Sequence, residues 1–181
     1  MFISVIGRDR PGILAAISRI LQDQDCNIEN ISQTILQSVF GALMIVSIPE
    51  SLEEQSLKSI ILKNLSDPDL DVFVKAYDRV TAAVDTVSSH PFVITTLGPD
   101  KPGLVNAITT VFAKYDINVT NLKAVFKGGT DPRDNVMIFE VDMPAETSLP
   151  EVRTELQRAA QKLDLDINIQ HRKIFETMNR I

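Results

Sequence analysis

The sequence repeats itself at a fixed spacing, and this repeat constrains the fold more than any other feature. The segment GRDRPGIL at residues 7–14 returns as GPDKPGLV at residues 98–105, 91 positions later. At the same spacing, DCNIENI at residues 25–31 returns as DINVTNL at residues 116–122, with the aspartate and both asparagines in step. A chain of 181 residues is long enough for two small domains, each with its own core. The repeat therefore predicts two copies of one domain in tandem.

The second copy is longer than the first in its middle. Ile48-Pro49 matches Met143-Pro144 at a spacing of 95, so four extra residues fall near the segment KGGTDP at residues 127–132. Glycine, aspartate and proline favour turns, and we expect a longer hairpin loop there. The repeat predicts the following organisation: a first domain at residues 1–80, a linker at 81–90, a second domain at 91–172, and a C-terminal tail at 173–181 that forms a short helix.

Each copy predicts the order strand, helix, strand, strand, helix, strand. A short apolar run rich in β-branched residues opens each copy, at residues 3–6 and 92–97, and is expected to form a strand. A helix follows, because apolar residues recur on one helical face: Ile13, Leu14, Ile17, Ile20 and Leu21 in the first copy, and Leu104, Val105, Ile108, Val111 and Phe112 in the second. Pro11 is expected in the first turn of this helix and Asp9 at its cap or in its first turn. The order suits an α+β fold of two tandem ferredoxin-like βαββαβ domains, each an antiparallel four-stranded sheet with helices on one face.

Charge and cysteine content limit the partners of such a protein. The net charge is −6, and an acidic chain without a basic cluster is a poor match for a nucleic-acid backbone. Cys26 is the only cysteine, which excludes an intrachain disulfide and fits a reducing compartment. The N-terminus lacks the features of a signal peptide, and no apolar run reaches the length of a membrane span. We expect a soluble cytoplasmic protein that binds neither nucleic acid nor membranes directly.

The sequence offers no set of residues that would carry catalysis. We find no nucleophile with a base, no carboxylate pair that can be assigned to a pocket and no cofactor fingerprint. Cys26, His90 and His171 are far apart and lack the spacing of metal ligands. Cys26 aligns with Ile117, so we interpret it as a small packed hydrophobe rather than a reactive thiol. The prediction is a protein that is not an enzyme, with no catalytic residues, no cofactor and no metal.

The repeated motifs resemble those of a known family. In each copy the first strand ends in Gly, Asp-Arg/Lys-Pro-Gly-Ile/Leu follows, and Asn-Ile/Val-x-Asn-Ile/Leu opens the second strand. This pattern is similar to that of the ACT domain, over nearly the whole chain and in two copies. The two-copy layout without a catalytic domain resembles the glycine cleavage system transcriptional regulators. One departure is that the second copy here keeps both motifs, which those regulators often lose.

The resemblance implies a regulatory function. ACT domains bind amino acids or other small effectors, usually at interfaces between domains, and they confer allosteric control. The regulator group implies action through a protein partner rather than through direct contact with DNA, and regulation of amino-acid metabolism or transcription, such as that of glycine cleavage. Pairing of ACT sheets side by side implies a homodimer. In the family, the asparagine that opens the second strand contacts the ligand from a neighbouring domain or subunit.

The chemistry of the turn agrees with ligand binding. A helix N-terminus carries unpaired N–H groups and attracts a carboxylate, and a glycine lets a ligand approach the backbone. Basic residues add attraction, and asparagine offers a donor and an acceptor to a zwitterion. We predict two similar ligand sites, each at a domain or subunit interface, formed by Asp9, Arg10, Gly12, Ile13, Asn27 and Ile28 in the first copy and by Asp100, Lys101, Gly103, Leu104, Asn118 and Val119 in the second.

Each of these residues also has a purely structural interpretation. The Pro-Gly pair then only shapes the connection from strand to helix, and Asn27 and Asn118 are ordinary turn residues. Arg10 and Lys101 are then solvated surface charges. On this interpretation the protein is a structural or dimerising interaction module without a ligand, and the sequence leaves this alternative open.

Overall fold

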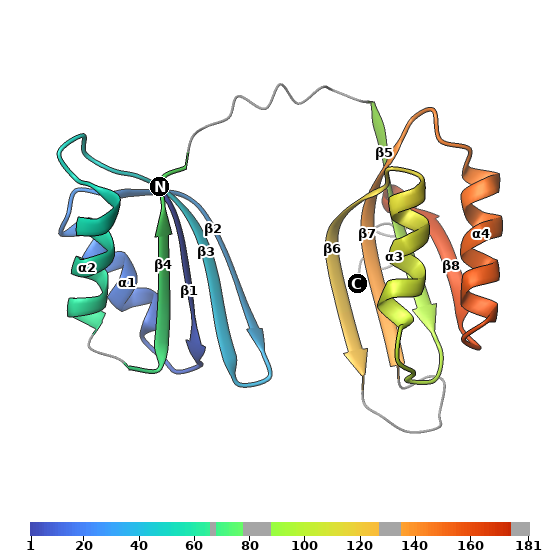
Figure 1. Ribbon diagram of the computed structural model, residues 1–181, viewed down its shortest axis with the longest axis horizontal. Helices are drawn as coiled ribbons and strands as arrows, with labels where there is room; N and C mark the ends of the chain where they lie inside the picture. Colours follow the sequence, from blue (N-terminus) through green and yellow to red (C-terminus); the bar gives the residue numbers. More distant parts are fainter. Residues whose placement is uncertain (66–67, 78–87, 127–134, 175–181) are drawn as a thin grey trace. The chain divides into compact units, whose positions relative to one another are not determined.

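The computed structural model describes residues 1–65, 68–77, 88–126 and 135–174, and the chain divides into two compact units, Met1–Ala82 and Ala83–Ile181 (Figure 1). The described residues of each unit form a four-stranded antiparallel sheet and two longer helices. The tandem βαββαβ fold predicted from the repeat is confirmed. The first strand of the second unit begins at Ser89, so Ser89 and His90 belong to a sheet and not to a linker.

The first unit consists of β1 (Phe2–Arg8), α1 (Ile13–Gln22), β2 (Asn27–Leu36), β3 (Val39–Ser47), α2 (Glu54–Leu65) and β4 (Leu70–Lys75). Its strands lie in the order β2-β3-β1-β4, and every neighbouring pair is antiparallel. Because β3 is antiparallel to both β1 and β2, the strands β1 and β2 run in the same direction. Helix α1 therefore carries the chain back along the sheet, from the end of β1 to the start of β2.

The second unit repeats this arrangement with β5 (Ser89–Leu97), α3 (Leu104–Lys114), β6 (Asn118–Phe126), β7 (Asn135–Pro144), α4 (Leu149–Gln161) and β8 (Asp166–His171). Its strand order is β6-β7-β5-β8, again antiparallel throughout. The likeness extends to an irregularity, because β2 shifts register between Ile28 and Asn30 and β6 shifts between Val119 and Asn121. The same bulge thus follows the first asparagine of both copies.

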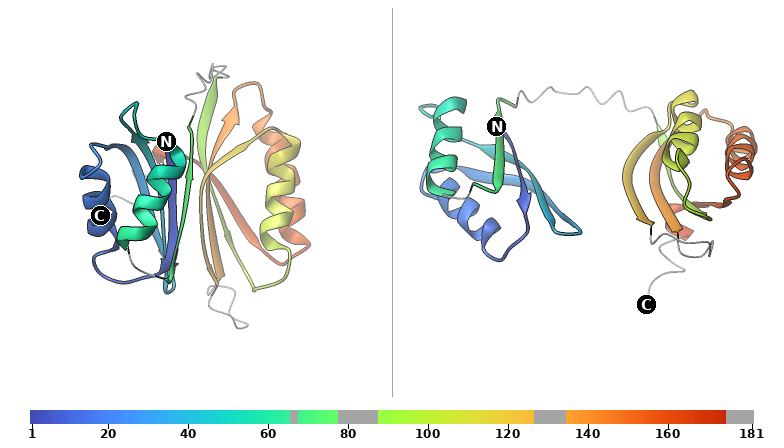
Figure 2. Two further views of the ribbon diagram at one scale, coloured as in Figure 1. Left: turned by 60° about the vertical axis from the view of Figure 1, so that its left-hand side comes forward. Right: turned by 60° about the horizontal axis from the view of Figure 1, so that its bottom comes forward.

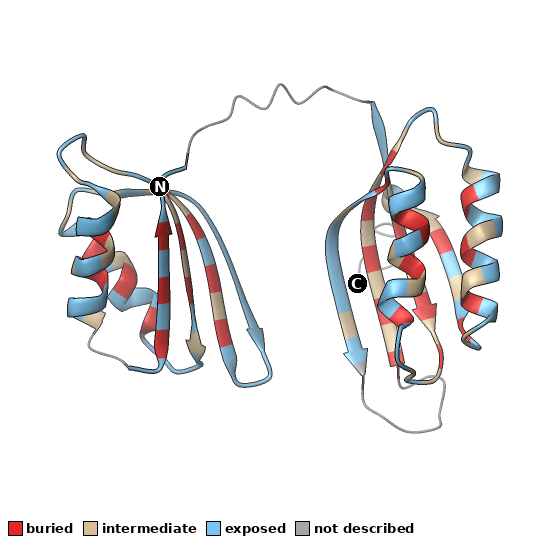
Figure 3. Cartoon of the chain, viewed as in Figure 1, coloured by how far each residue is buried: buried red, intermediate tan, exposed pale blue. Residues whose placement is uncertain are grey.

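The helices of each unit cover one face of its sheet, as Figure 2 shows from two further directions. Burial alternates along the strands beneath them, and in β7 every second residue from Asn135 to Met143 is buried (Figure 3). The predicted apolar helix face is also buried in part: Ile13, Ile17, Ile20 and Leu21 of α1, and Leu104, Ile108, Val111 and Phe112 of α3. Leu14 and Val105, expected on the same face, are exposed.

The helices begin later than the sequence suggests. Helix α1 starts at Ile13, its N-cap is Gly12 and its first turn contains no acid, so the expected roles of Pro11 in the first turn and of Asp9 as cap are wrong. The reason is the left-handed conformation of Gly12, which ends the turn and only then permits helical geometry.

Two further expectations concern the ends of the described segments. The hairpin loop expected at residues 127–132 lies outside the described residues. Of the tail at 173–181, only Lys173 and Ile174 are described, and they belong to a helical turn that starts at Arg172. Within the described parts of the chain, no helix is long and apolar enough to cross a membrane.

Candidate functional site

The two glycines at the starts of α1 and α3 have the same unusual backbone conformation. Gly12 has φ 94° and Gly103 has φ 90°, a region that residues with a side chain seldom adopt. A Cβ atom built on either glycine meets no atom within 4 Å, so the space beside each turn is open. Both copies thus present the turn as the sequence predicted, with an accessible backbone at the helix start.

No side chain caps either helix start. The first intrahelical bonds join Ala16 N to Gly12 O and Ala107 N to Gly103 O, each at 2.9 Å. The preceding N–H groups have no intrahelical partner, as at any helix start, and neither N-cap residue makes a side-chain hydrogen bond. The first turns contain no acidic residue. The positive end of each helix dipole is therefore left for an external anion, for which a carboxylate is suitable.

Two residues of the turns, Asp9 and Lys101, are bonded to other parts of their own unit. Lys101 donates a hydrogen bond from Nζ to the Asp164 carboxylate, in the connection between α4 and β8. In the first unit, the Asp9 amide donates to the Ser38 carbonyl at 2.8 Å, which ties the turn to the hairpin between β2 and β3. Arg10 and the carboxylates of Asp9 and Asp100 are exposed. Lys101 thus holds the turn against the body of the unit, a role that the sequence did not predict.

The asparagines predicted for the site lie at the other end of each sheet. Asn27 pairs with Ser47 at the end of β3, whereas Arg8 pairs with Val39 at its start. A strand of nine residues such as β3 spans about 27 Å. The same separation holds in the second unit, where Asn118 pairs with Asp142. One unit therefore cannot bring its own glycine turn and asparagine together, and the two halves of the predicted site would have to come from different ACT units.

Two polar residues beneath the second turn were missed from the sequence. Thr96 and Asn135 are 1% and 2% exposed, and they are the only buried polar side chains among the described residues. Their counterparts in the first copy are Val5 and Phe40, which belong to the apolar core. The repeat aligns each of them with an apolar residue, but it does so at other positions too, so the sequence alone did not single them out.

The faces of the sheets that the helices leave uncovered differ between the units. In the first unit this outer face carries exposed apolar side chains: Ile6, Leu36, Val39, Leu43 and Phe73. Leu43 and Phe73 both pair with Ser4, and the Phe73 ring meets Phe2 edge to face at 6.4 Å between centroids. Exposed apolar side chains gathered on one surface are typical of an interaction surface.

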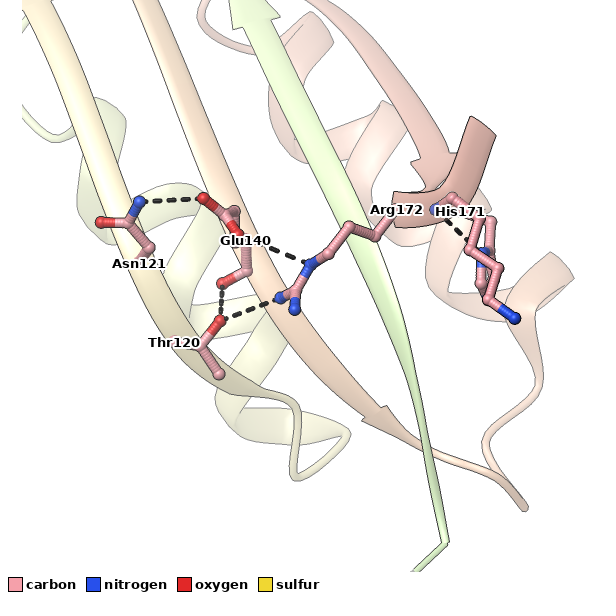
Figure 4. A network of polar contacts seen from close by, with 6 residues as sticks. Thr120, Asn121, Glu140, His171 and Arg172 are labelled. Carbon is pink, nitrogen blue, oxygen red and sulfur yellow. Dashed lines mark hydrogen bonds and ion pairs between the residues drawn. The ribbon is translucent and has the colours of Figure 1, made fainter. Parts of the chain in front are cut away.

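The outer face of the second sheet carries a cluster of polar side chains beside apolar ones such as the exposed Val125. Figure 4 shows Glu140 of β7 accepting a hydrogen bond from Asn121 at 2.9 Å and forming an ion pair with Arg172 at 3.5 Å. Arg172 also donates to the Thr120 hydroxyl at 3.2 Å. Val93, which pairs with Glu140 across the strands, is buried. The side chains of the second unit therefore cover part of this face of its own sheet.

Cys26 is half-buried against the first core and its thiol donates to the Gln24 carbonyl at 3.5 Å. Burial, and secondly the nearby Asp25 carboxylate, raise the pKa of the Cys26 thiol. A raised pKa lowers the fraction of nucleophilic thiolate at neutral pH. The observation supports the packed hydrophobe predicted from the repeat and disfavours the reactive alternative.

Surface grooves lie between the two helices of each unit, and neither Gly12 nor Gly103 is among the residues that line them. The groove between α1 and α2 has a volume of about 440 Å³ and is lined by Ala15, Ala16, Arg19, Ile20, Asp23, Gln24, Ile60 and Asn64. Of its lining, Ala15 and Ala16 lie in the first half of α1, and Arg19 and Ile20 lie in the second half. We therefore assign the candidate site from the backbone geometry of the turns, not from a preformed hollow.

Comparison with known proteins identifies the family of the chain. The model of the ACT domain matches residues 1–75 and 90–170. A UPF0237 protein of Methanopyrus kandleri is 33% identical over 91 residues, which are 49% of this chain and 96% of that protein. A UPF0237 protein of Clostridium perfringens is 38% identical over 77 residues, 42% of this chain and 86% of that protein. Each of these relatives thus matches about half of the chain.

Two solved structures share the fold over nearly the whole chain. An unknown protein from Galdieria sulphuraria is 24% identical, with coverage of 94% of this chain and 96% of that one and a TM-score of 0.74. A candidate glycine cleavage system transcriptional repressor is 21% identical, with coverage of 93% and 94% and a TM-score of 0.61. The chain is therefore a tandem ACT-domain protein that belongs to the UPF0237 family.

Proposed function

We propose that this protein is a sensor that binds a small carboxylate effector, most directly an amino acid, at the helix starts after Gly12 and Gly103. The observation that carries the proposal is the pair of uncapped helix N-termini beside open glycine turns. Backbone N–H groups at such a terminus bind a carboxylate without any further side chain. The repetition of this geometry in both copies supports two sites rather than one.

The rest of each site is contributed by another ACT unit. Asn27 and Asn118 lie at the sheet end opposite the glycine turns, and Ile28 and Val119 follow them at the bulges. An asparagine amide brought from a second unit would supply a donor for the carboxylate and an acceptor for the ammonium group. Ligand binding and association of ACT units are then coupled, because each stabilises the other.

Association of this kind has a suitable surface in the first unit. The apolar outer face around Leu43 and Phe73 is exposed in the unit by itself. A homodimer that covers this face would remove apolar area from water. A protein partner would then respond to whether the ligand is bound. Through this partner the protein would control amino-acid metabolism or transcription, such as that of glycine cleavage, as the name of one structural neighbour suggests.

The experiment is thermal unfolding of the full chain with each of the twenty amino acids in large excess. A ligand at a hundred times its dissociation constant adds about 2.7 kcal/mol to the state that binds it. For a domain of this size the melting temperature then rises by about 5–10 °C. We expect such a rise with one amino acid or a related group of them.

Two matched variants assign the effect to the turns. Gly12→Val and Gly103→Val fill the open space beside each helix start and should each remove the rise that belongs to their own site. Gly41→Ala is the control, because Gly41 lies in β3 and a Cβ there makes only an ordinary contact at 3.7 Å. A wild-type protein that responds to no amino acid would instead favour the structural or dimerising module.

A further inference from the structure

The second unit contains a buried amide that has no partner among the residues that the structure describes. Within that part of the chain, neither Oδ1 nor Nδ2 of Asn135 makes a hydrogen bond, although the side chain is 2% exposed. Buried polar groups in proteins are almost always paired, and one left unpaired lowers stability. Such an exception calls for an explanation in terms of function or of a missing partner.

Asn135 lies directly below the second glycine turn. It opens β7, and its carbonyl accepts a hydrogen bond from the Gly98 amide at 3.2 Å, at the point where the chain leaves β5 for Gly103. Asn135 alternates with the buried Met137 and Phe139, so its side chain lies on the face that the helices cover. The unpaired amide is therefore held at the sheet end from which the ligand turn departs.

Thr96 extends this polar spot. It pairs with Met137 across the strands, while the neighbouring Gly98 bonds to Asn135, so the two polar side chains are diagonal neighbours on one face. Diagonal neighbours in a sheet lie about 7–8 Å apart. Thr96 thus adds a hydroxyl to the same face as the Asn135 amide.

The first copy shows that the fold does not need polar residues here. Val5 and Phe40 occupy the matching positions, and both are packed in the first core. Gly7 and Phe40 pair across β1 and β3 as Gly98 and Asn135 do in the second unit. The two buried polar side chains are thus specific to the second unit, and the ACT fold itself does not require them.

We propose that Asn135 and Thr96 are specificity-determining residues of the second site, and that this site takes an amino acid whose side chain is neutral and hydrogen-bonding, a hydroxyl or a carboxamide. The inference rests on the sensor function proposed above. A charged side chain is disfavoured because none of the buried residues described is charged, and an unpaired buried charge is costly. Contact with Asn135 requires the turn at residues 98–103 to move outward when the ligand enters.

The test is calorimetric titration of the full chain with three pairs of amino acids of similar shape: serine and alanine, threonine and valine, asparagine and leucine. A site that hydrogen-bonds a ligand group discriminates strongly against the analogue without it. We expect the polar member of at least one pair to bind about tenfold or more tightly than its apolar partner. Asn135→Leu and Thr96→Val should each reduce this ratio toward one.

One control variant and the outcome of the titration separate the possible results. Phe40→Leu changes the matching position of the first copy and should leave the ratio unchanged. Binding that persists in Asn135→Leu and Thr96→Val with the same ratio would overturn the specificity assignment but leave the sensor function standing. Absence of binding by any of the six amino acids, in a wild-type protein that melts cooperatively, would overturn the assignment. If the wider panel also gives no response, the sensor function fails as well.

Discussion

The two ACT units share one fold and one turn geometry but differ in where they place polar and apolar side chains. Among the described residues of the first unit, the buried interior is apolar and includes Val5 and Phe40, and the outer sheet face carries exposed Leu43 and Phe73. The second has Asn135 in its interior and a closed polar network around Glu140 on its outer face. The first unit is thus better suited to association, and the second to selective recognition.

The two copies share the backbone conformation of the turn but differ in the side chains around it. Gly12 and Gly103 keep φ values within a few degrees of each other, because any other residue would be strained there. The side chains that line the matching positions around these turns are under no such constraint. The shared turns therefore bear on a function common to both units, and the differences between the copies bear on what each unit recognises.

The largest predicted effect concerns the first core. Phe40→Ala removes a buried aromatic side chain and should lower the free energy of unfolding by about 3–5 kcal/mol. The matching change Asn135→Ala in the second unit removes an unpaired amide and should cost far less. Urea unfolding followed by circular dichroism checks both variants, and equal losses would contradict the difference between the two interiors.

The next effect has the opposite sign. Asn135→Leu replaces the unpaired amide with an apolar group of similar size, so the free energy of unfolding without ligand should rise by about 1–3 kcal/mol. The same measurement on Phe40→Leu should show a loss. A fall in stability for Asn135→Leu would mean that the amide has a partner in solution, such as water, and would weaken the contrast.

The glycine turns should respond alike in the two units. Gly12→Ala and Gly103→Ala force a side chain into the left-handed region and should each cost about 1–2 kcal/mol. Gly41→Ala, in an extended strand, should be neutral or slightly stabilising. Thermal unfolding of the three variants measures these changes in stability. If Gly12→Ala leaves the stability unchanged and Gly103→Ala lowers it, the two turns are not equivalent.

The smallest effect concerns the ion pair that anchors the second turn. Lys101→Met should lower the free energy of unfolding by less than about 1 kcal/mol, because Lys101 is partly exposed and Asp164 largely so. The loss should shrink further at high salt, since screening weakens exposed pairs. A loss well above this range would mean that the pair holds the turn far more firmly than its exposure suggests.

Much of the fold follows from periodicity and repetition in the sequence. The apolar positions of α1 and α3 and the alternation in β7 predict helices and strands, because burial selects those residues directly. The start of α1 was less predictable, since it depends on the conformation of Gly12 rather than on the sequence of Pro11 and Asp9. The bulges after Asn27 and Asn118 could not be predicted, because they produce no periodic pattern of apolar residues in the sequence.

The site residues stay a prediction, and sequence and structure contribute differently to it: the turn motif points to the glycines, whereas only the family resemblance implied that the asparagines act from another domain or subunit. The glycine turns were identified because their residues are special at both positions of the repeat. That Asn27 lies at the far end of the sheet from Gly12 depends on strand direction, which becomes visible once β1 and β2 are seen to run in parallel. Asn135 was missed because an asparagine at the start of a strand resembles a turn residue until its burial is known.

The most direct test of the central claim is a map of ligand contacts on the backbone. Two-dimensional ¹⁵N–¹H spectra of the full chain would be recorded with and without the amino acid that gives the largest thermal shift. We predict that the amide signals of Ile13, Leu104 and their next two residues move most, with changes also at Asn27 and Asn118. Changes confined to the groove around Arg19 and Ile60, or to no helix start at all, would contradict a sensor that binds its ligand at the glycine turns.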